Sequence, residues 1–440
     1  MANKFLLILF MLTSIIGLSQ DRKTKFTLQE AIDYALENNR QAKNAALDIA
    51  AAKVQKWETT AAGLPQVGAT IDYINNIKQQ FGQPVDFDNN GFIDFGARQS
   101  VNAQATINQL IFDGSYLVGL QASKVFLEIS RNAKEKTDLE VRKAVINAYG
   151  NVLLTKESIV LLEKNISILE KNLNDVTKIY QNGLEEEESV EQLKITLSGV
   201  KSNLNNVKRL QIVGYKMLNI AIGKAINDPI VATDSLDTLA QKNITINLLE
   251  PNDNIENTID FKIADNNKRS KELLVKLEKS KALPTIGAFI NGAYLGNSQK
   301  FTFLNDNQQW LGTANFGVRI TIPVFGFGLQ SSRTQRAKIN LDIAKNNLTD
   351  TEQQLKLEIA AAKSDFQFAI EDYDNKKENL KLAERIEEKN QIKFFEGIAS
   401  SFELRQAQTQ LYQAQNELLQ TMLDVITKKA ELETVLNVIP

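Results

Sequence analysis

The chain has 440 residues, of which 43% are hydrophobic and 24% charged, as in folded proteins. Its formal net charge of -2 gives no general attraction to nucleic acid, which is bound through clustered Lys and Arg, so we expect no nucleic-acid partner. With 0 Cys and 0 His, the sequence excludes disulfides, thiolate nucleophiles, Cys/His metal sites and histidine acid–base chemistry. We therefore predict that the protein is not an enzyme and uses no cofactor, although carboxylate or Ser/Lys chemistry stays open in principle.

The N-terminal residues have the pattern of a secretory signal peptide. Lys4 supplies a positive end, Phe5 to Ile16 form a mostly apolar run, and small residues precede Gln20. We predict a signal peptide at residues 1–19. No later stretch is apolar over the ~18 residues that a membrane-spanning helix needs. If the mature chain enters a membrane, we expect it to do so as a β-barrel.

The mature chain contains an internal two-fold repeat. Leu64-Pro65 recurs as Leu283-Pro284, and Ile111-Phe112-Asp113-Gly114 matches Val324-Phe325-Gly326-Phe327-Gly328. The segment from Gly183 likewise corresponds to the segment from Gly397. Each half is predicted to contain a helix, two strands, a long helix, a tight turn and a second long helix. We predict a first repeat at residues 20–223, a connector at 224–254 and a second repeat at 255–440.

The first predicted helix opens with a capping box, in which Thr27 and Glu30 satisfy each other's backbone amides, and runs to about Thr60. Its counterpart in the second half is predicted from Ile255 to Lys281. The predicted strands cover residues ~64–76, ~100–112, ~284–296 and ~313–325.

Apolar and polar residues alternate along these strands. Val101, Ala103 and Ala105 point one way and the intervening Asn and Gln the other; Phe316 to Val324 repeats the pattern, with Arg319 on the polar side. A half-buried soluble sheet also alternates. The strand lengths of about 9–11 residues and the aromatic residues near the strand ends favour a membrane barrel, with Arg319 in its lumen. Because about eight strands are needed to close a packed barrel, four strands per chain require oligomerisation.

The loop between the first two strands, residues 77–100, contains a partial calcium motif. Asp86, Asp88 and Asn90 match the start of an EF-hand loop. Ala97 stands at the twelfth position, where the motif needs a bidentate Glu. The alternative is an ordinary polar turn rich in Asp, Asn and Gly.

Each half then continues into a predicted coiled-coil hairpin, at residues ~115–223 and ~329–436. Leu162, Leu169 and Val176 belong to a heptad pattern. About 65 helical residues would span roughly 95–100 Å. Such a hairpin also suits a structural rod, but here the strands lead directly into the helices. A ring of strands therefore predicts a ring of helices below it.

The sequence resembles the TolC-type outer-membrane efflux proteins, also called outer membrane factors. The resemblance covers nearly the whole mature chain and rests on Thr27 to Ala31, the two Leu-Pro strand starts, Ile111 to Gly114, Pro323 to Gly326 and the Gly-containing hairpin tips. It implies an α+β membrane protein, a homotrimer with one shared β-barrel, four strands per chain, continuous with a long antiparallel coiled-coil α-barrel.

The resemblance also implies location and partners. The barrel would lie in the outer membrane, among its lipids, with the helices in the periplasm. The tips would dock on a periplasmic adaptor protein linked to an inner-membrane RND, ABC or MFS transporter. The chain would then be the passive exit duct of an efflux or type I secretion system. The exported substrate is set by the pump and is not encoded here.

The family closes its periplasmic end with acidic residues after the second tip. In this sequence those positions are Glu403 and Gln406, and the matching first-half positions are Ser189 and Gln192. A ring of Glu403 carboxylates would favour cations; alternatively, Glu403 is a solvated helix residue. Candidate adaptor-docking residues at the two tips are Gly183, Val190, Gly397, Ser401 and Phe402.

A rival interpretation from another class is a periplasmic coiled-coil scaffold with a small soluble sheet and no membrane barrel. Recovery of the protein in the soluble periplasm would favour that interpretation. An envelope hydrolase that uses carboxylates has no supporting motif.

Overall fold

The computed structural model describes residues 24–78, 97–244, 246–250 and 254–438. The predicted signal peptide and the calcium-loop candidates Asp86, Asp88 and Asn90 lie outside these residues. The chain forms two compact units, each of which takes segments from both predicted repeats. Unit 1 comprises residues 1–46, 133–261 and 352–440, and unit 2 comprises residues 47–132 and 262–351. The repeat boundaries stay a prediction.

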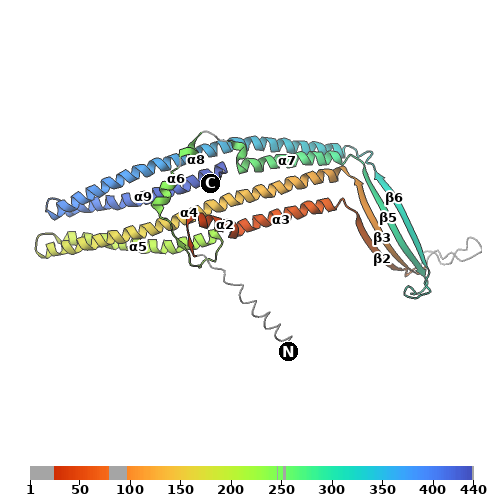
Figure 1. Cartoon of the computed structure of the whole chain (residues 1–440), viewed down its shortest axis with the longest axis horizontal. Helices are drawn as coiled ribbons and strands as arrows, with labels where there is room; N and C mark the ends of the chain where they lie inside the picture. Colours follow the sequence, from red (N-terminus) through yellow and green to blue (C-terminus); the bar gives the residue numbers. More distant parts are fainter. Residues whose placement is uncertain (1–23, 79–96, 245, 251–253, 439–440) are drawn as a thin grey trace, which may run out of the picture. The chain divides into compact units, whose positions relative to one another are not determined.

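Two helical hairpins dominate unit 1. The first pairs the later part of α4 (Gly114–Gln181) with α5 (Glu187–Ile222), and the second pairs α8 (Leu329–Phe395) with α9 (Ser401–Leu436) (Figure 1). Both turns use a left-handed glycine, Gly183 at φ 76° and Gly397 at φ 73°. At each turn the next residue's N–H bonds the carbonyl five residues back, which is a Schellman ending. The tight turns predicted at the two glycines are therefore confirmed.

The core of unit 1 is built around a short parallel strand pair. β1 (Lys25–Phe26) pairs with β4 (Val231–Ala232), next to α2 (Leu28–Asn38) and α6 (Leu236–Asn243). The capping box predicted at Thr27 and Glu30 is present. The fully buried Tyr149 hydroxyl contacts the Phe26 carbonyl oxygen at 2.8 Å and Asp234 Oδ2 at 2.9 Å, and burial raises its pKa.

The prediction of a single helix from Thr27 to about Thr60 is wrong, because the helix is interrupted at Asn39. This residue has extended backbone (φ -60°, ψ 138°), and α3 begins after it at Arg40–Ala61. Its side-chain amide donates to the Ala221 carbonyl at 2.8 Å, while its oxygen accepts from the Gln41 N–H. The bond to Ala221 on α5 is a tertiary contact at this interruption, while the bond from Gln41 is local, at the start of α3. The connector also contains a 3-10 turn at Ile246–Leu249. The helix predicted from Ile255 begins later, at Ile259, because a 3-10 turn at Ile255–Asn257 precedes it.

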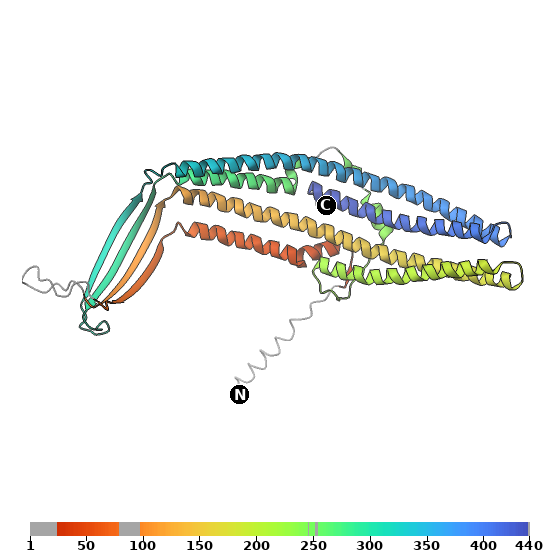
Figure 2. The same ribbon diagram turned by 180° about the vertical axis from the view of Figure 1, so that it is seen from behind.

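Unit 2 contains a four-stranded antiparallel sheet in the order β2-β3-β5-β6. Its strands are β2 (Gln66–Asn75), β3 (Gln99–Phe112), β5 (Thr285–Ser298) and β6 (Trp310–Thr321), which lie side by side in both ribbon views (Figure 1, Figure 2). Helix α7 (Ile259–Ser280) leads to β5.

The last strand ends earlier than the sequence predicts. Strand ~313–325 was expected, but β6 begins at Trp310 and ends at Thr321. Its final ladder partner is Thr285, the first residue of β5, so no neighbouring strand remains for Ile322 to Phe325. Pro323 also lacks the N–H that a ladder requires. The apolar alternation continues past the end of the sheet.

Candidate functional site

The sheet has one continuous apolar face, because its register aligns the apolar positions of all four strands. Ile71 pairs with Ala103, Ala103 with Tyr294, and Tyr294 with Gly312. Side chains of directly paired residues lie on the same face. That face comprises Val67, Ala69, Ile71, Tyr73, Val101, Ala103, Ala105, Ile107, Ile286, Ala288, Ile290, Tyr294, Ala314, Phe316, Val318 and Ile320.

This apolar face is open in the single chain. Val67, Ile71 and Phe316 are 73%, 76% and 70% exposed. Patches of this extent on soluble monomers mark a surface that something apolar covers. Among the described strand residues of this face, polar side chains occur only near its ends, for example Gln99 and Gln109. The face is therefore suited to contact with lipid or with another apolar surface.

The opposite face is mainly polar. It includes Asn102, Gln104, Thr106 and Asn108 on β3 and an Asn291–Asn315 side-chain hydrogen bond of 3.3 Å. Arg319, predicted on the polar side, lies on this face.

The strand pattern from Ile286 to Tyr294 is weak because Phe289 also projects onto the polar face. Its ring occupies the space above Gly317, where an added Cβ would lie 2.5 Å from the ring. The Arg319 guanidinium lies 5.4 Å from the centre of the same ring.

Aromatic side chains gather at the end of the sheet far from the helices. The Tyr73 ring meets Phe301 at 5.9 Å and Phe303 at 6.1 Å in edge-to-face geometry, and Phe303 lies 6.3 Å from Trp310. Tyr and Trp suit an interface that is apolar on one side and wet on the other. The sequence predicted aromatics at the strand ends, and this cluster confirms the prediction at one end.

A second apolar segment follows β6 at the helical end of the sheet. Val324, Phe325 and Phe327 are 89%, 77% and 92% exposed, and the last two rings lie 4.6 Å apart. Phe327 has positive φ (46°), an uncommon backbone conformation for a bulky residue. The segment joins the sheet to α8.

The two outer strands have free hydrogen-bonding edges. β2 and β6 each pair with a single neighbour among the described residues. An open edge presents unpaired N–H and C=O groups that another chain can pair with. Both edges are long, with 10 residues in β2 and 12 in β6.

The two hairpin tips touch within unit 1. The Ser189 hydroxyl, 4% exposed, bonds Ser401 Oγ at 2.8 Å and Glu185 Oε1 at 2.6 Å. Val190, also 4% exposed, packs in a cluster with Phe394 and Leu404. Ser189 and Val190 are therefore covered by other residues of the same chain. Heptad spacing alone did not reveal this tip-to-tip contact.

Glu403 completes a second capping box. Its carboxylate accepts from the Ser400 N–H at 2.8 Å and from Ser400 Oγ at 3.0 Å. Hydrogen bonds from the Ser400 backbone and hydroxyl lower its pKa below the usual carboxyl value. Gln406 and Phe402 are exposed, and Gln192 donates to Glu188 at 2.6 Å. The exposed tip candidates are therefore Gly183, Gly397, Phe402, Glu403 and Gln406.

Buried amides join the two hairpins above the tips, and the sequence did not single them out. Asn165 donates to Gln415 Oε1 at 2.8 Å, and Gln391 donates to Asn172 Oδ1 at 3.3 Å. The two Asn residues stand one heptad apart on α4, beside the apolar positions that the heptad analysis found. The sequence signal that indicates these contacts is a polar residue repeated at heptad spacing beside the apolar positions.

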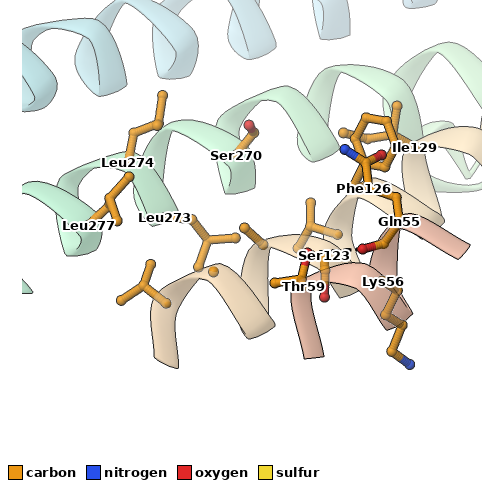
Figure 3. A pocket seen from close by; sticks show the side chains of 14 residues that line it. Gln55, Lys56, Thr59, Ser123, Phe126, Ile129, Ser270, Leu273, Leu274 and Leu277 are labelled. Atoms are coloured by element: carbon orange, nitrogen blue, oxygen red, sulfur yellow. Dashed lines mark hydrogen bonds between the residues drawn. The ribbon is translucent and has the colours of Figure 1, made fainter. Parts of the chain in front are cut away.

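An apolar cavity of about 310 Å³ lies in unit 2 between α3, α4 and α7. Side chains from all three helices converge on it (Figure 3), including Thr59, Phe126, Leu273 and Leu277. Its lining contains no carboxylate, and Lys56 is the charged residue at its edge. The lining therefore supplies no acid–base pair.

The described residues contain no cluster of carboxylates suited to holding a metal ion. In the same part of the chain, no helix combines the length and apolar composition needed to cross a bilayer.

A sheet with one apolar and one polar face, joined to two long helical hairpins, defines a helix-rich α+β chain with an internal repeat. The family model described as outer membrane efflux protein matches residues 31–224 and 251–438. The chain therefore belongs to the outer membrane efflux protein family, whose members are channels and not enzymes. No curated relative matches the sequence.

Solved outer-membrane channels share this fold. The chain is similar to the outer membrane protein VceC of Vibrio cholerae (TM-score 0.74, 15% identity, 93% of this chain and 95% of that one). It is also similar to the CmeC outer membrane channel of Campylobacter jejuni (0.71, 17%, 93% and 85%). A third match is the open state of the Neisseria gonorrhoeae MtrE outer membrane channel (0.72, 17%, 93% and 88%). At these identities the likeness concerns the fold alone.

Proposed function

We propose that this chain is one subunit of a trimeric outer-membrane channel, the passive exit duct of a tripartite efflux or type I secretion system. Its strands form one β-barrel with those of two further copies, and its hairpins form a tunnel in the periplasm. The tips dock on a periplasmic adaptor, which connects the duct to an RND, ABC or MFS transporter in the inner membrane.

The observation that supports this proposal is the two-faced sheet with open edges. An apolar outer face and a polar inner face are what a barrel wall in lipid needs. A four-stranded sheet with free edges is not stable in the hydrocarbon region of a membrane, where every backbone amide must be hydrogen-bonded. Closure between copies removes both edges, because β6 of one subunit can pair with β2 of the next.

Cross-linking tests this shared barrel, and the absence of native Cys makes the background clean. We expect Ile71→Cys on β2, combined in turn with Cys at Gly312, Ala314 or Phe316 on β6, to give a disulfide-linked trimer ladder. Within one chain β2 and β6 are separated by two strands, so their backbones lie roughly 14 Å apart. Disulfides need Cα atoms within about 7 Å, so only neighbouring subunits can be linked.

The control is Ile71→Cys alone, which should give no ladder. Non-reducing gel electrophoresis of outer-membrane fractions provides the measurement. Monomer only from every β2–β6 pair, or recovery of the protein in the soluble periplasm, would support the rival periplasmic scaffold.

We further propose that Glu403 contributes a negative ring at the periplasmic constriction. The test is Glu403→Gln, because Gln at this position of a capping box can still bond the Ser400 amide while the charge is removed. We expect weaker block of single-channel current by divalent cations with unchanged helical content. Glu403→Ala should weaken block equally and also loosen the tip. Unchanged block in both variants would assign Glu403 to capping alone.

The sign of the pH dependence follows from the lowered pKa of Glu403. The negative charge of the Glu403 carboxylate is fully present above the ordinary Glu pKa, and it is lost as the pH falls through the lowered pKa. Cation block should therefore persist at mildly acidic pH.

A further inference from the structure

The polar face of the sheet contains a hollow at its helical end. In the ladder between β5 and β6, Phe289 stands opposite Gly317, and Gly287 stands opposite Arg319. The Phe289 ring fills the space above Gly317, and the Arg319 guanidinium lies over that ring. Gly287 has no side chain, and the nearest atom to a Cβ placed there is the Gln109 carbonyl oxygen at 3.6 Å. The surface is therefore open beside the ring and the guanidinium.

The hollow is part of a cavity of about 350 Å³, within the usual size range of small-molecule sites. One wall is the Phe289 ring, and apolar side chains such as Leu64 and Leu110 also line the cavity. Its hydrogen-bonding groups include the Asn108 amide and the Thr321 hydroxyl. The cavity thus combines an aromatic surface with hydrogen-bonding groups and one guanidinium.

The charge of the hollow is supplied by Arg319. Among the described residues, Arg319 makes no ion pair with a carboxylate. Asp113 also lines the cavity, but its Oδ1 accepts the N–H groups of Ser115 and Tyr116 at the start of α4. The Phe289 ring holds the Arg319 guanidinium in place without neutralising it, since a cation over an aromatic face keeps its charge. Its N–H donors therefore stay available to a ligand.

From this geometry we infer that the hollow binds a small organic anion that carries a carboxylate next to an aromatic ring. The planar guanidinium matches a carboxylate with two parallel hydrogen bonds. The ligand ring fits over Gly287, where it meets the edge or face of Phe289. If the sheet is the barrel wall, a placement that rests on the proposed function, each subunit contributes one such anion site to the lumen.

Benzoate is a suitable probe, with benzamide as its neutral counterpart, and binding can be followed by saturation-transfer NMR on the full-length protein in detergent. Arg319→Gln is expected to weaken benzoate binding roughly tenfold or more, the usual effect of losing a charged hydrogen-bond pair. The matched control is Arg336→Gln, an exposed arginine on α8, which should leave benzoate binding unchanged. Benzamide should bind weakly and equally to the wild type, Arg319→Gln and Arg336→Gln.

A second variant keeps the charge and removes the space. Gly287→Val should reduce benzoate binding as strongly as Arg319→Gln, because its side chain occupies the hollow. Three results would overturn the inference. The first is equal benzoate affinity in the wild type, Arg319→Gln and Gly287→Val. The second is an equal loss of benzoate binding in the Arg336→Gln control, and the third is a wild-type affinity for benzamide equal to that for benzoate. The binding assay needs no pore. A failed cross-link would therefore overturn the proposed barrel and leave the anion site unaffected, and a failed binding assay would overturn the anion site and leave the barrel unaffected.

Discussion

Ala105→Arg is expected to prevent stable assembly of the protein in the outer membrane. Ala105 lies near the middle of β3 on the apolar face, paired with Ala69 and Gly292. An arginine on the lipid side of a membrane barrel costs about 2–4 kcal/mol at the bilayer midplane. The cost recurs in each of three subunits of the proposed trimer. We expect the heat-modifiable oligomer to disappear from outer-membrane fractions.

The matched control is Thr106→Arg, one residue further along the same strand. Thr106 lies on the polar face, paired with Gly68 and Asn291, and its hydroxyl accepts a hydrogen bond of 3.3 Å from the Gln104 amide. In a barrel this side faces water, so the oligomer should form. On a soluble sheet both substitutions would be surface changes worth about 0.5 kcal/mol or less. Equal recovery of the two variants would therefore contradict a lipid-facing surface.

The strands and their two faces could be predicted from alternation alone, but the register could not. A one-residue shift in the pairing of β3 would move Ala105, together with all the remaining residues of its apolar side, to the polar side of the sheet. Alternation also continued past the true end of β6, since Ile322 and Val324 fit the pattern although β5 offers them no partner. Ladder length depends on the neighbouring strand, which a local pattern does not contain.

The helices and their tips were predictable from local signals because those signals act within one turn. Left-handed glycines and capping boxes fix the helix ends through neighbouring backbone groups. The burial of Ser189 and Val190 depends on a second hairpin more than two hundred residues away in sequence, as the Ser189–Ser401 bond shows. The break at Asn39 has the same origin, because its amide bonds the Ala221 carbonyl.

Gly223→Ala is expected to be the most destabilising single-methyl change in unit 1. Gly223 ends α5 with φ 85°, and a Cβ there would lie 2.3 Å from the Asn38 carbonyl oxygen and 2.8 Å from the Asn39 nitrogen. The left-handed backbone alone costs an L-residue about 1–2 kcal/mol. The overlap adds ~2 kcal/mol, typical of overpacking, because the neighbour is backbone and cannot rotate away. We expect a loss of about 3 kcal/mol.

Two other glycines separate these contributions. Gly183→Ala places the same methyl at φ 76° in open space at the first tip, so it should cost only the left-handed term. Gly199→Ala lies inside α5 with nothing within 4 Å, and should stabilise the helix by about 0.5–1 kcal/mol. Denaturant midpoints followed by helical circular dichroism, at fixed protein concentration, give the ranking. Equal and small losses of stability in Gly223→Ala and Gly183→Ala would show that α5 does not approach the Asn38–Asn39 backbone so closely in solution. The interruption of the helix at Asn39 would then need another cause.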